Sequence, residues 1–288
     1  MRRFIQLLAV FLVALAAPAT AGTQYYYYGY YYVPVRAQPA AERYVSPAVQ
    51  AERAARAAYG PFRVLDDHTA ALVAVTDSQS PEWFQAMLRD YPGIATLRFV
   101  ECPGTHDDRA NLALGRMIRA AGLAAYVPDG GSVRSGAVEL VLAGTSLTID
   151  DGARFAVHAW LDEDGFEATD YAADSPMNRR YLNYYREMGM DEAEAASFYA
   201  MTNSVPFEQA RWLSGPEMRG WVVRTGPSLD TGSEANAAAR SAEAPSLLAR
   251  AAAELAAPAL RVPAPAAEPL AAQPAPRLAY LDLGLTLF

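Results

Sequence analysis

Between residues 62 and 223 the chain alternates short apolar runs with segments in which apolar residues recur every three or four positions. The short runs predict strands, because turn residues bound them and they are too brief for helices. Phe155 and Val157 share one face of a strictly alternating stretch over residues 153–160, which predicts a further strand. The continuous apolar runs that predict the other strands are residues 70–75, 94–100 and 124–127.

Two amphipathic helices are predicted between these strands. Ser80 and Pro81 supply a cap residue and a proline at the first helical position, so the first helix is expected to begin there. The second is expected to be capped by Asp107 and to end at Gly122. Strands that alternate with helices require crossover connections, so the fold class is α/β with a largely parallel sheet. The residues expected on the apolar faces are Phe84, Met87, Leu88 and Tyr91 in the first helix and Leu114, Met117, Ile118 and Ala121 in the second.

Composition excludes several kinds of chemistry. The 288 residues carry a formal net charge of -8, which argues against a nucleic-acid binder because such proteins need a basic face. All 24 basic residues are arginine, so Schiff-base, P-loop and Ser–Lys mechanisms are excluded. The single cysteine, Cys102, excludes an intramolecular disulfide. Imidazole chemistry is restricted to His68, His106 and His158.

The N-terminus has the three parts of a secretory signal peptide. Two arginines follow Met1, residues 4–17 form an uncharged and mostly apolar run, and Ala19-Thr20-Ala21 offers a cleavage motif. The alternative is an uncleaved membrane anchor, but the run is shorter than the ~20 residues that a spanning helix needs. Cleavage after Ala21 and export, into the periplasm if the source is Gram-negative, are therefore expected. No ATP or coenzyme A is expected in that compartment.

The composition changes on both sides of the alternating region. Residues 22–60 are first rich in tyrosine and then in alanine and arginine. The tyrosines are interpreted as an extended low-complexity tail, with stacking on sugars or on a partner as the alternative. A domain is expected over 61–225. Residues 226–288 are dominated by Ala, Pro, Ser and Glu, a composition that predicts disorder because too little apolar surface can be buried. Within this tail, 246–255 predicts a transient helix and 280–288 a single strand.

A serine and a histidine are placed where acyl-transfer chemistry could occur. Ser135 follows a glycine-bearing turn and precedes a helix-like run that ends at Gly144, so free backbone N–H groups are expected beside it. His158 lies on the face of the predicted strand 153–160 opposite to Phe155, and it could reach Ser135 from a neighbouring strand end. Spacing alone leaves open that both residues are structural.

The order of motifs resembles the ClpP/crotonase superfamily, and in particular the secreted bacterial ClpP-like proteins. The resemblance covers residues 62–225 and implies a spiral of βαβ units. It implies that residues 181–188 and 191–201 are a helical insert after the histidine strand. The motifs are Cys102-Pro103-Gly104, Ser135-Gly136-Ala137, Ala143-Gly144, Phe155-Ala156-Val157-His158 and a closing Trp212-Leu213-Ser214-Gly215-Pro216-Glu217, in which Ser214 and Glu217 also form a capping box.

The resemblance also implies roles for individual residues. Ser135 is implied to be the nucleophile and His158 the general base. The backbone N–H groups of Thr105 and Gly136 are implied to form the oxyanion hole.

Three positions depart from the pattern of the superfamily. Thr105 stands where a second glycine is usual, so its backbone has less freedom to present an N–H group. Arg134 replaces a small residue beside the nucleophile, where it could select acidic groups or block the cleft. The third member of the triad has no clean match, and Asn203 and Glu208 are the candidates.

Other sites are weaker candidates. Asp66-Asp67-His68 and His106-Asp107-Asp108 could ligate a metal together, but both segments also suit polar turns and a helix cap. Cys102 with His106 could mimic a Cys–His pair, although a small core residue is the simpler interpretation. The aromatic residues interpreted as core, with substrate lining as the alternative, are Tyr181, Tyr184, Tyr185 and Trp212.

Two functions follow from these observations. The first is an exported serine peptidase or acyl hydrolase that acts on peptides or unfolded proteins, needs no cofactor or metal, and has no ATPase partner. The resemblance implies a homo-oligomer. The second is an inactive ClpP-like scaffold that binds envelope partners through its tails.

Overall fold

The computed structural model of this chain describes residues 24–28, 31–35, 46–222 and 234–257. The predicted signal peptide at 1–21 and the predicted C-terminal strand at 280–288 lie outside the described residues. No helix within the described ranges is long and apolar enough to cross a membrane.

A six-stranded mixed sheet forms one layer of the molecule, with the order β10-β8-β6-β5-β4-β3. Its strands β5, β6, β8 and β10 are parallel, whereas β3 and β4 join the edge in antiparallel pairs. Its members are β3 (Ala57–Tyr59), β4 (Phe62–Val64), β5 (Thr69–Leu72), β6 (Thr96–Phe99), β8 (Ala124–Val127) and β10 (Leu147–Ile149).

A four-stranded sheet with the order β12-β11-β9-β7 forms a second layer. Its strands β7, β9 and β11 are parallel, and β12 closes the edge in antiparallel orientation. Each of these three parallel strands directly follows a strand of the larger sheet along the chain, so every turn of the spiral contributes to both layers. The members are β7 (Glu101–Cys102), β9 (Ser132–Arg134), β11 (Arg154–Val157) and β12 (Arg211–Ser214).

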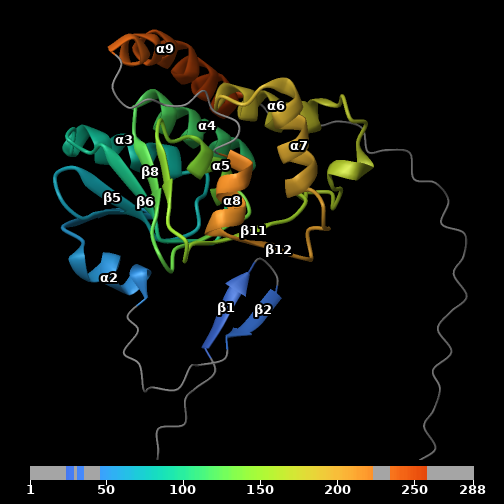
Figure 1. The fold of residues 1–288 in the computed structure, drawn as a ribbon, viewed down its shortest axis with the longest axis horizontal. Helices are drawn as coiled ribbons and strands as arrows, with labels where there is room; N and C mark the ends of the chain where they lie inside the picture. Colours follow the sequence, from blue (N-terminus) through green and yellow to red (C-terminus); the bar gives the residue numbers. More distant parts are fainter. Residues whose placement is uncertain (1–23, 29–30, 36–45, 223–233, 258–288) are drawn as a thin grey trace, which may run out of the picture.

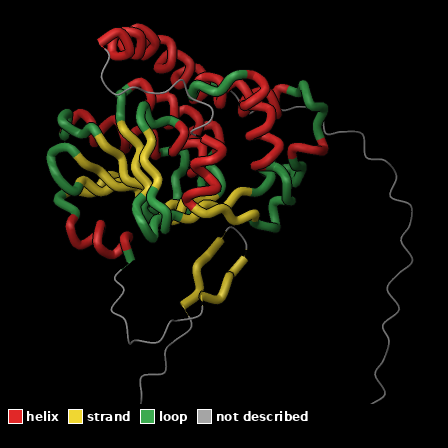
Figure 2. Tube along the Cα trace, viewed as in Figure 1, coloured by secondary structure: helices red, strands yellow, loops and turns green. Residues whose placement is uncertain are grey.

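Helices α3 and α4 cover one face of the larger sheet, and α6 and α7 stand beside them near the smaller sheet (Figure 1). The separate strand and helix layers are also seen in Figure 2. These observations confirm the predicted α/β class with mostly parallel strands. The helices are α2 (Pro47–Ala54), α3 (Ser80–Asp90), α4 (Asp108–Ala120), α5 (Ala137–Leu142), α6 (Pro176–Glu187), α7 (Glu192–Thr202), α8 (Gly215–Val222), α9 (Glu234–Ala256) and a 3-10 turn, η1 (Ala168–Asp170).

Local signals explain where the helices begin. The side chain of Asp107 caps α4 as predicted, because it accepts a hydrogen bond from the N–H of Ala110 at 3.0 Å. The predicted Ser214–Glu217 capping box also forms, at the start of α8. Ser80 was expected to cap α3, but it is the first residue of that helix, and its hydroxyl bonds to the preceding Asp77 turn.

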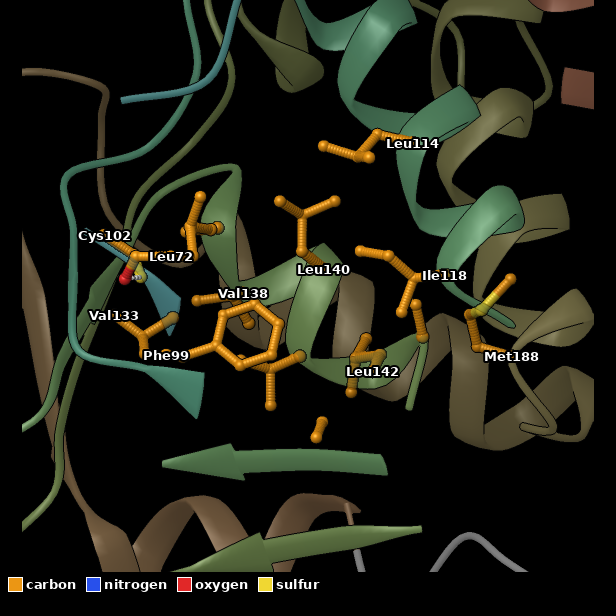
Figure 3. Packing of buried hydrophobic residues seen from close by; sticks show 14 of the residues in the cluster. Leu72, Phe99, Cys102, Leu114, Ile118, Val133, Val138, Leu140, Leu142 and Met188 are labelled. Atoms are coloured by element: carbon orange, nitrogen blue, oxygen red, sulfur yellow. Dashed lines mark hydrogen bonds between the residues drawn. The ribbon is translucent and has the colours of Figure 1, made fainter. Parts of the chain in front are cut away.

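The apolar faces of α3 and α4 pack into the core between the layers. Phe84 and Met87 are fully buried, and Leu114, Met117 and Ile118 are buried on α4. Figure 3 shows Leu114 and Ile118 facing side chains of α5 and of the sheets. The prediction for Ala121 is wrong, because α4 ends at residue 120 and Ala121 is exposed.

Cys102 is part of this core. Its side chain is fully buried, its thiol donates to the carbonyl of Leu72 at 3.4 Å, and burial raises its pKa. Figure 3 shows the two residues side by side. The interpretation as a core residue is confirmed, and a buried, protonated thiol is unsuited to pair with the exposed His106.

The segments outside the predicted domain boundaries contain regular structure. Residues 24–28 (β1) and 31–35 (β2), inside the tyrosine-rich stretch, pair as an antiparallel hairpin. The predicted transient helix in the tail is part of α9, which packs along α4 and buries Leu247 and Ala251. Helix α2 buries Ala51 against the sheet.

Candidate active site

The ends of three parallel strands bring the predicted site residues together. Thr105 follows β7 and His158 follows β11, whereas Ser135 and Gly136 follow β9. Because the three strands pair in parallel, their carboxyl ends lie at one edge of the smaller sheet. All four residues line a single cavity of about 1150 Å³.

The backbone of Ser135 is held in an unusual conformation. Its φ angle is 50°, and it is the one non-glycine residue with positive φ in the described part of the chain. Non-glycine residues in this region carry strain of roughly 1–3 kcal/mol and are found preferentially at functional sites. The N–H of Ser135 donates to the carbonyl of Ala156 at 2.8 Å, which ties the residue to β11. The sharp turn therefore presents the hydroxyl at the end of β9 instead of continuing the strand.

The turn after β7 approaches this serine closely. Gly104 has a φ angle of 127°, and a Cβ atom on it would lie 3.0 Å from the Cβ of Ser135. The positive φ therefore favours glycine at residue 104, and a Cβ there would also make a tight contact with Ser135. Thr105 does not have positive φ, so its backbone does not require the glycine that the superfamily has there.

Two backbone N–H groups beside Ser135 are available to a ligand. Thr105 and Thr76 form an isolated parallel bridge. Its two hydrogen bonds join Thr76 to the carbonyl of Gly104 and to the N–H of His106. The N–H of Thr105 takes no part in the bridge and points away from Thr76. Within the described residues, the N–H groups of Thr105 and Gly136 donate to no acceptor. A Cβ on Gly136 would lie 2.6 Å from Cγ2 of Thr105, so the two residues that carry these donors are in close contact. Such a pair can stabilise a developing oxyanion.

A buried asparagine holds the two turns together. Asn111, on α4, donates from Nδ2 to the carbonyl of Gly136 at 2.6 Å and accepts from the hydroxyl of Thr76 at 2.9 Å. Sequence reasoning missed this residue. The available signal was an amide three positions before Leu114 on the apolar face of a helix, where a buried polar group needs partners.

His158 is oriented by a backbone carbonyl. Its Nδ1 lies 2.8 Å from the carbonyl oxygen of Ala159. A carbonyl only accepts, so Nδ1 carries the proton and Nε2 of the neutral ring is free to act as a base. Burial lowers the pKa of His158 from its ordinary value of 6.5, which keeps the ring neutral at pH 7. No hydrogen bond joins it to Ser135 among the described contacts, and such bonds often form only with substrate bound.

Both candidates for the third residue lie on the segment that packs beside His158. The carbonyl of Val205 accepts the N–H of Ala159 at 2.9 Å, and the ring of Phe207 packs edge-on against the imidazole at 4.8 Å between centroids. Asn203 lines the cavity, but its Nδ2 donates to the carbonyl of Tyr199 at 2.8 Å, and its Oδ1 is buried without a partner. Glu208 is exposed. The contact that orients the imidazole is thus the carbonyl of Ala159, and the assignment of a third residue stays a prediction.

Solved structures of ClpP-like proteins are similar to this chain, whereas no protein-family model and no curated protein matches its sequence. A variant of ClpP1 from Listeria monocytogenes is 16% identical, with a TM-score of 0.38, over 55% of this chain and 89% of that one. Two variants of the 1510-N membrane-bound stomatin-specific protease, one in complex with a substrate peptide, are each 12% identical. Their TM-scores are 0.36 and 0.35, over 56% of this chain and 74% and 79% of theirs. The similarity concerns the fold alone.

Arg134 does not enter the cavity. Its guanidinium binds the carboxylate of Glu101 and the hydroxyl of Ser132, so its charge is compensated within the smaller sheet.

No group of three or more His, Cys, Asp or Glu side chains in the described ranges is arranged to hold a metal ion. His68 instead contacts the carbonyl of Gly93 from a surface turn.

The aromatic residues of the insert form one wall of the cavity. Tyr181, Tyr184 and Tyr185, on α6, are buried as predicted, and Tyr181 and Tyr185 also line the cavity. The prediction for Trp212 is wrong. Only one face of β12 points inward, and Trp212 is on the other face with 54% of its surface exposed.

A carboxyl group that sequence reasoning missed lies behind these tyrosines. Glu139, on α5, lines the cavity but is buried. Its Oε1 accepts from the hydroxyl of Tyr185 at 2.8 Å, and its carbonyl accepts from Tyr184 at 2.6 Å. Burial raises its pKa from 4.5 to about 7. A glutamate within an otherwise apolar helix was the only signal in the sequence.

Proposed function

We propose that this protein is a serine hydrolase of the peptidase type in which Ser135 is the nucleophile and His158 the general base. The observation that carries the proposal is the meeting of three strand ends at one cavity. They supply a strained serine, a histidine whose free nitrogen is Nε2, and the open N–H groups of Thr105 and Gly136. Each of these is needed for acyl transfer, and no one of them is sufficient.

The arrangement supports a two-step reaction. The hydroxyl oxygen of Ser135 bonds to the carbonyl carbon of a peptide while its proton passes to Nε2 of His158, and the negative oxygen is bound by the two N–H groups. His158 then returns the proton to the amine as the C–N bond breaks. Water then gives a proton to Nε2 of His158 as its oxygen bonds to the acyl carbon. The bond between the acyl carbon and the serine oxygen breaks, His158 returns the proton to that oxygen, and the acid leaves.

Labelling with a fluorophosphonate, followed by intact-mass analysis, tests this proposal. The expected result is one adduct on the protein, lost in Ser135→Ala and strongly slowed in His158→Ala. Ser204→Ala and His68→Ala are matched controls. Ser204 lies on an exposed loop, where its hydroxyl accepts from Arg211, and His68 lies on a surface turn. Absence of an adduct on folded protein would exclude an activated serine and favour the alternative of an inactive binding scaffold.

We also propose that the protein acts after export, because residues 1–21 have the composition of a cleavable signal peptide. An exported peptidase has no access to ATP-driven unfoldases, so its substrates would be short or already unfolded chains. Assembly into a homo-oligomer is proposed on the basis of the resemblance, and light scattering of the protein from Gly22 onward would test it.

A further inference from the structure

Two arginines line the cavity, Arg109, which donates to the carbonyl of Leu255, and Arg180, whose charge is only partly compensated. The side chain of Arg180, on α6, is 13% exposed, and its nearest carboxylate, that of Asp108, is 3.6 Å away. Asp108 already accepts a hydrogen bond of 2.6 Å from the hydroxyl of Tyr181. A guanidinium that has left bulk water loses free energy unless it is closely paired, so this position is suited to a further anion.

The guanidinium is held in place by aromatic rings. Its central carbon lies 4.9 Å from the centre of the Tyr181 ring and 5.7 Å from that of Trp160, distances at which cation–π attraction operates. Nη2 makes a long contact of 3.4 Å with the hydroxyl of Tyr181, and Nε is buried without a partner. Within the described residues Nη1 donates to no acceptor, and Arg180 lines the cavity, so this nitrogen is left for a ligand bound there.

Other carboxylates line the same cavity, but Asp108 is the only one in the described residues within 4.0 Å of the Arg180 guanidinium. Asp107 caps α4, Glu139 accepts from Tyr185, and Glu101 pairs with Arg134. The remaining three belong to the loop after β11, where Asp162 accepts from Tyr171 and from the N–H of Phe166, and Glu163 and Asp164 are exposed.

We propose that Arg180 binds a carboxylate of the substrate, so that the site favours peptides that carry one close to the bond to be cleaved. The planar guanidinium suits a carboxylate, and its position on the wall formed by α6 places it in the cavity that holds Ser135. The carboxylate has two possible sources, an acidic side chain or the C-terminus of the chain. That the carboxylate belongs to a peptide rests on the proposed function.

Binding to the full-length Ser135→Ala protein tests this inference without requiring turnover. Three fluorescent peptides of one length would be compared by anisotropy, namely a neutral peptide with an amidated C-terminus, the same peptide with a free C-terminus, and an amidated peptide with one glutamate. The protein is expected to bind at least one carboxylate peptide about tenfold more tightly than the neutral one. Which of the two is preferred identifies the source.

Adding Arg180→Gln to the Ser135→Ala protein is expected to bring the ratio of affinities for the carboxylate and neutral peptides close to one. Arg180→Lys is expected to give an intermediate ratio, because lysine keeps the positive charge but lacks the planar, two-pronged guanidinium. Arg179→Gln is the matched control, since its side chain points outward from the same helix turn to Asp174. Circular dichroism and the melting temperature establish that each variant is folded. Equal affinity for all three peptides, or an unchanged ratio in Arg180→Gln, would overturn the inference. Failure of the proposed function would instead appear as missing fluorophosphonate labelling of the unmodified serine protein.

Discussion

Burial of Glu139 makes a specific prediction about stability and pH. In the folded protein its pKa is raised from 4.5 to about 7, because desolvation outweighs the hydrogen bond from Tyr185. Between these two values the folded state holds a proton that the unfolded state has released. The stability that this carboxyl contributes is therefore complete below pH 4.5 and is lost as the pH rises through 7.

The size of the effect follows from the shift. Since one pKa unit corresponds to 1.36 kcal/mol, the free energy of unfolding should fall by about 3 kcal/mol over this range because of Glu139 alone. Glu139→Gln keeps the shape and an acceptor for Tyr185 but cannot ionise. The variant is expected to match the original protein near pH 4.5 and to be more stable by up to about 3 kcal/mol at pH 8.

Urea unfolding of both proteins at a series of pH values measures this difference, and other titrating groups cancel in the comparison. Glu243→Gln, an exposed position on α9, controls for the loss of one negative charge. Tyr185→Phe removes the hydrogen bond that lowers the pKa of Glu139, and it should move the transition to higher pH. A stability difference between Glu139→Gln and the original protein that is the same at pH 5 and pH 8 would refute the reasoning.

Three further predictions concern the site and its supports. Because burial lowers the pKa of His158, the fluorophosphonate labelling rate should fall with acid at a midpoint below 6.5, and a midpoint above 6.5 would contradict the assignment. Gly115→Ala would place a methyl 1.9 Å from the hydroxyl oxygen of Tyr184, so the melting temperature should drop clearly; an unchanged value would show that α6 can shift. Asn111→Ala leaves the Gly136 carbonyl without its donor. The free energy of unfolding in urea is expected to fall by about 1–3 kcal/mol, and labelling by fluorophosphonate is expected to be slower. Labelling at the original rate would exclude a positioning role for Asn111.

The helices were predictable where the sequence carries a strong local signal. Asp107 has a side chain that caps α4, and Leu114 and Ile118 repeat at helical spacing, so both the start and the face of that helix follow from local chemistry. The second sheet was not predicted. β7 has two residues and β9 has three, and runs this short show no periodicity.

The docking of α9 was missed for a different reason. Its sequence is rich in alanine and glutamate, which has the composition of a disordered tail. It packs along α4, burying Leu247 and Ala251, and is tied down by ion pairs of Arg250 with Glu187 at 2.8 Å and of Glu254 with Arg116 at 3.7 Å. Such contacts depend on the partner surface of α4 and are invisible in the composition of the segment itself.

The candidate site shows the same division between local and tertiary information. The positions of Ser135 and His158 in the order of motifs were enough to predict that they belong together, because the spiral brings successive strand ends to one edge. The partner of the imidazole could not be predicted, since a backbone carbonyl has no signature in the sequence. A carbonyl fixes the tautomer and the ring orientation, but unlike the carboxylate of a Ser-His-Asp triad it carries no full charge to stabilise the imidazolium. Asp108 and Glu167 raise the pKa of His158, yet burial outweighs them. The surroundings of His158 therefore favour a neutral and oriented ring, and under the proposed function this comes at the expense of base strength.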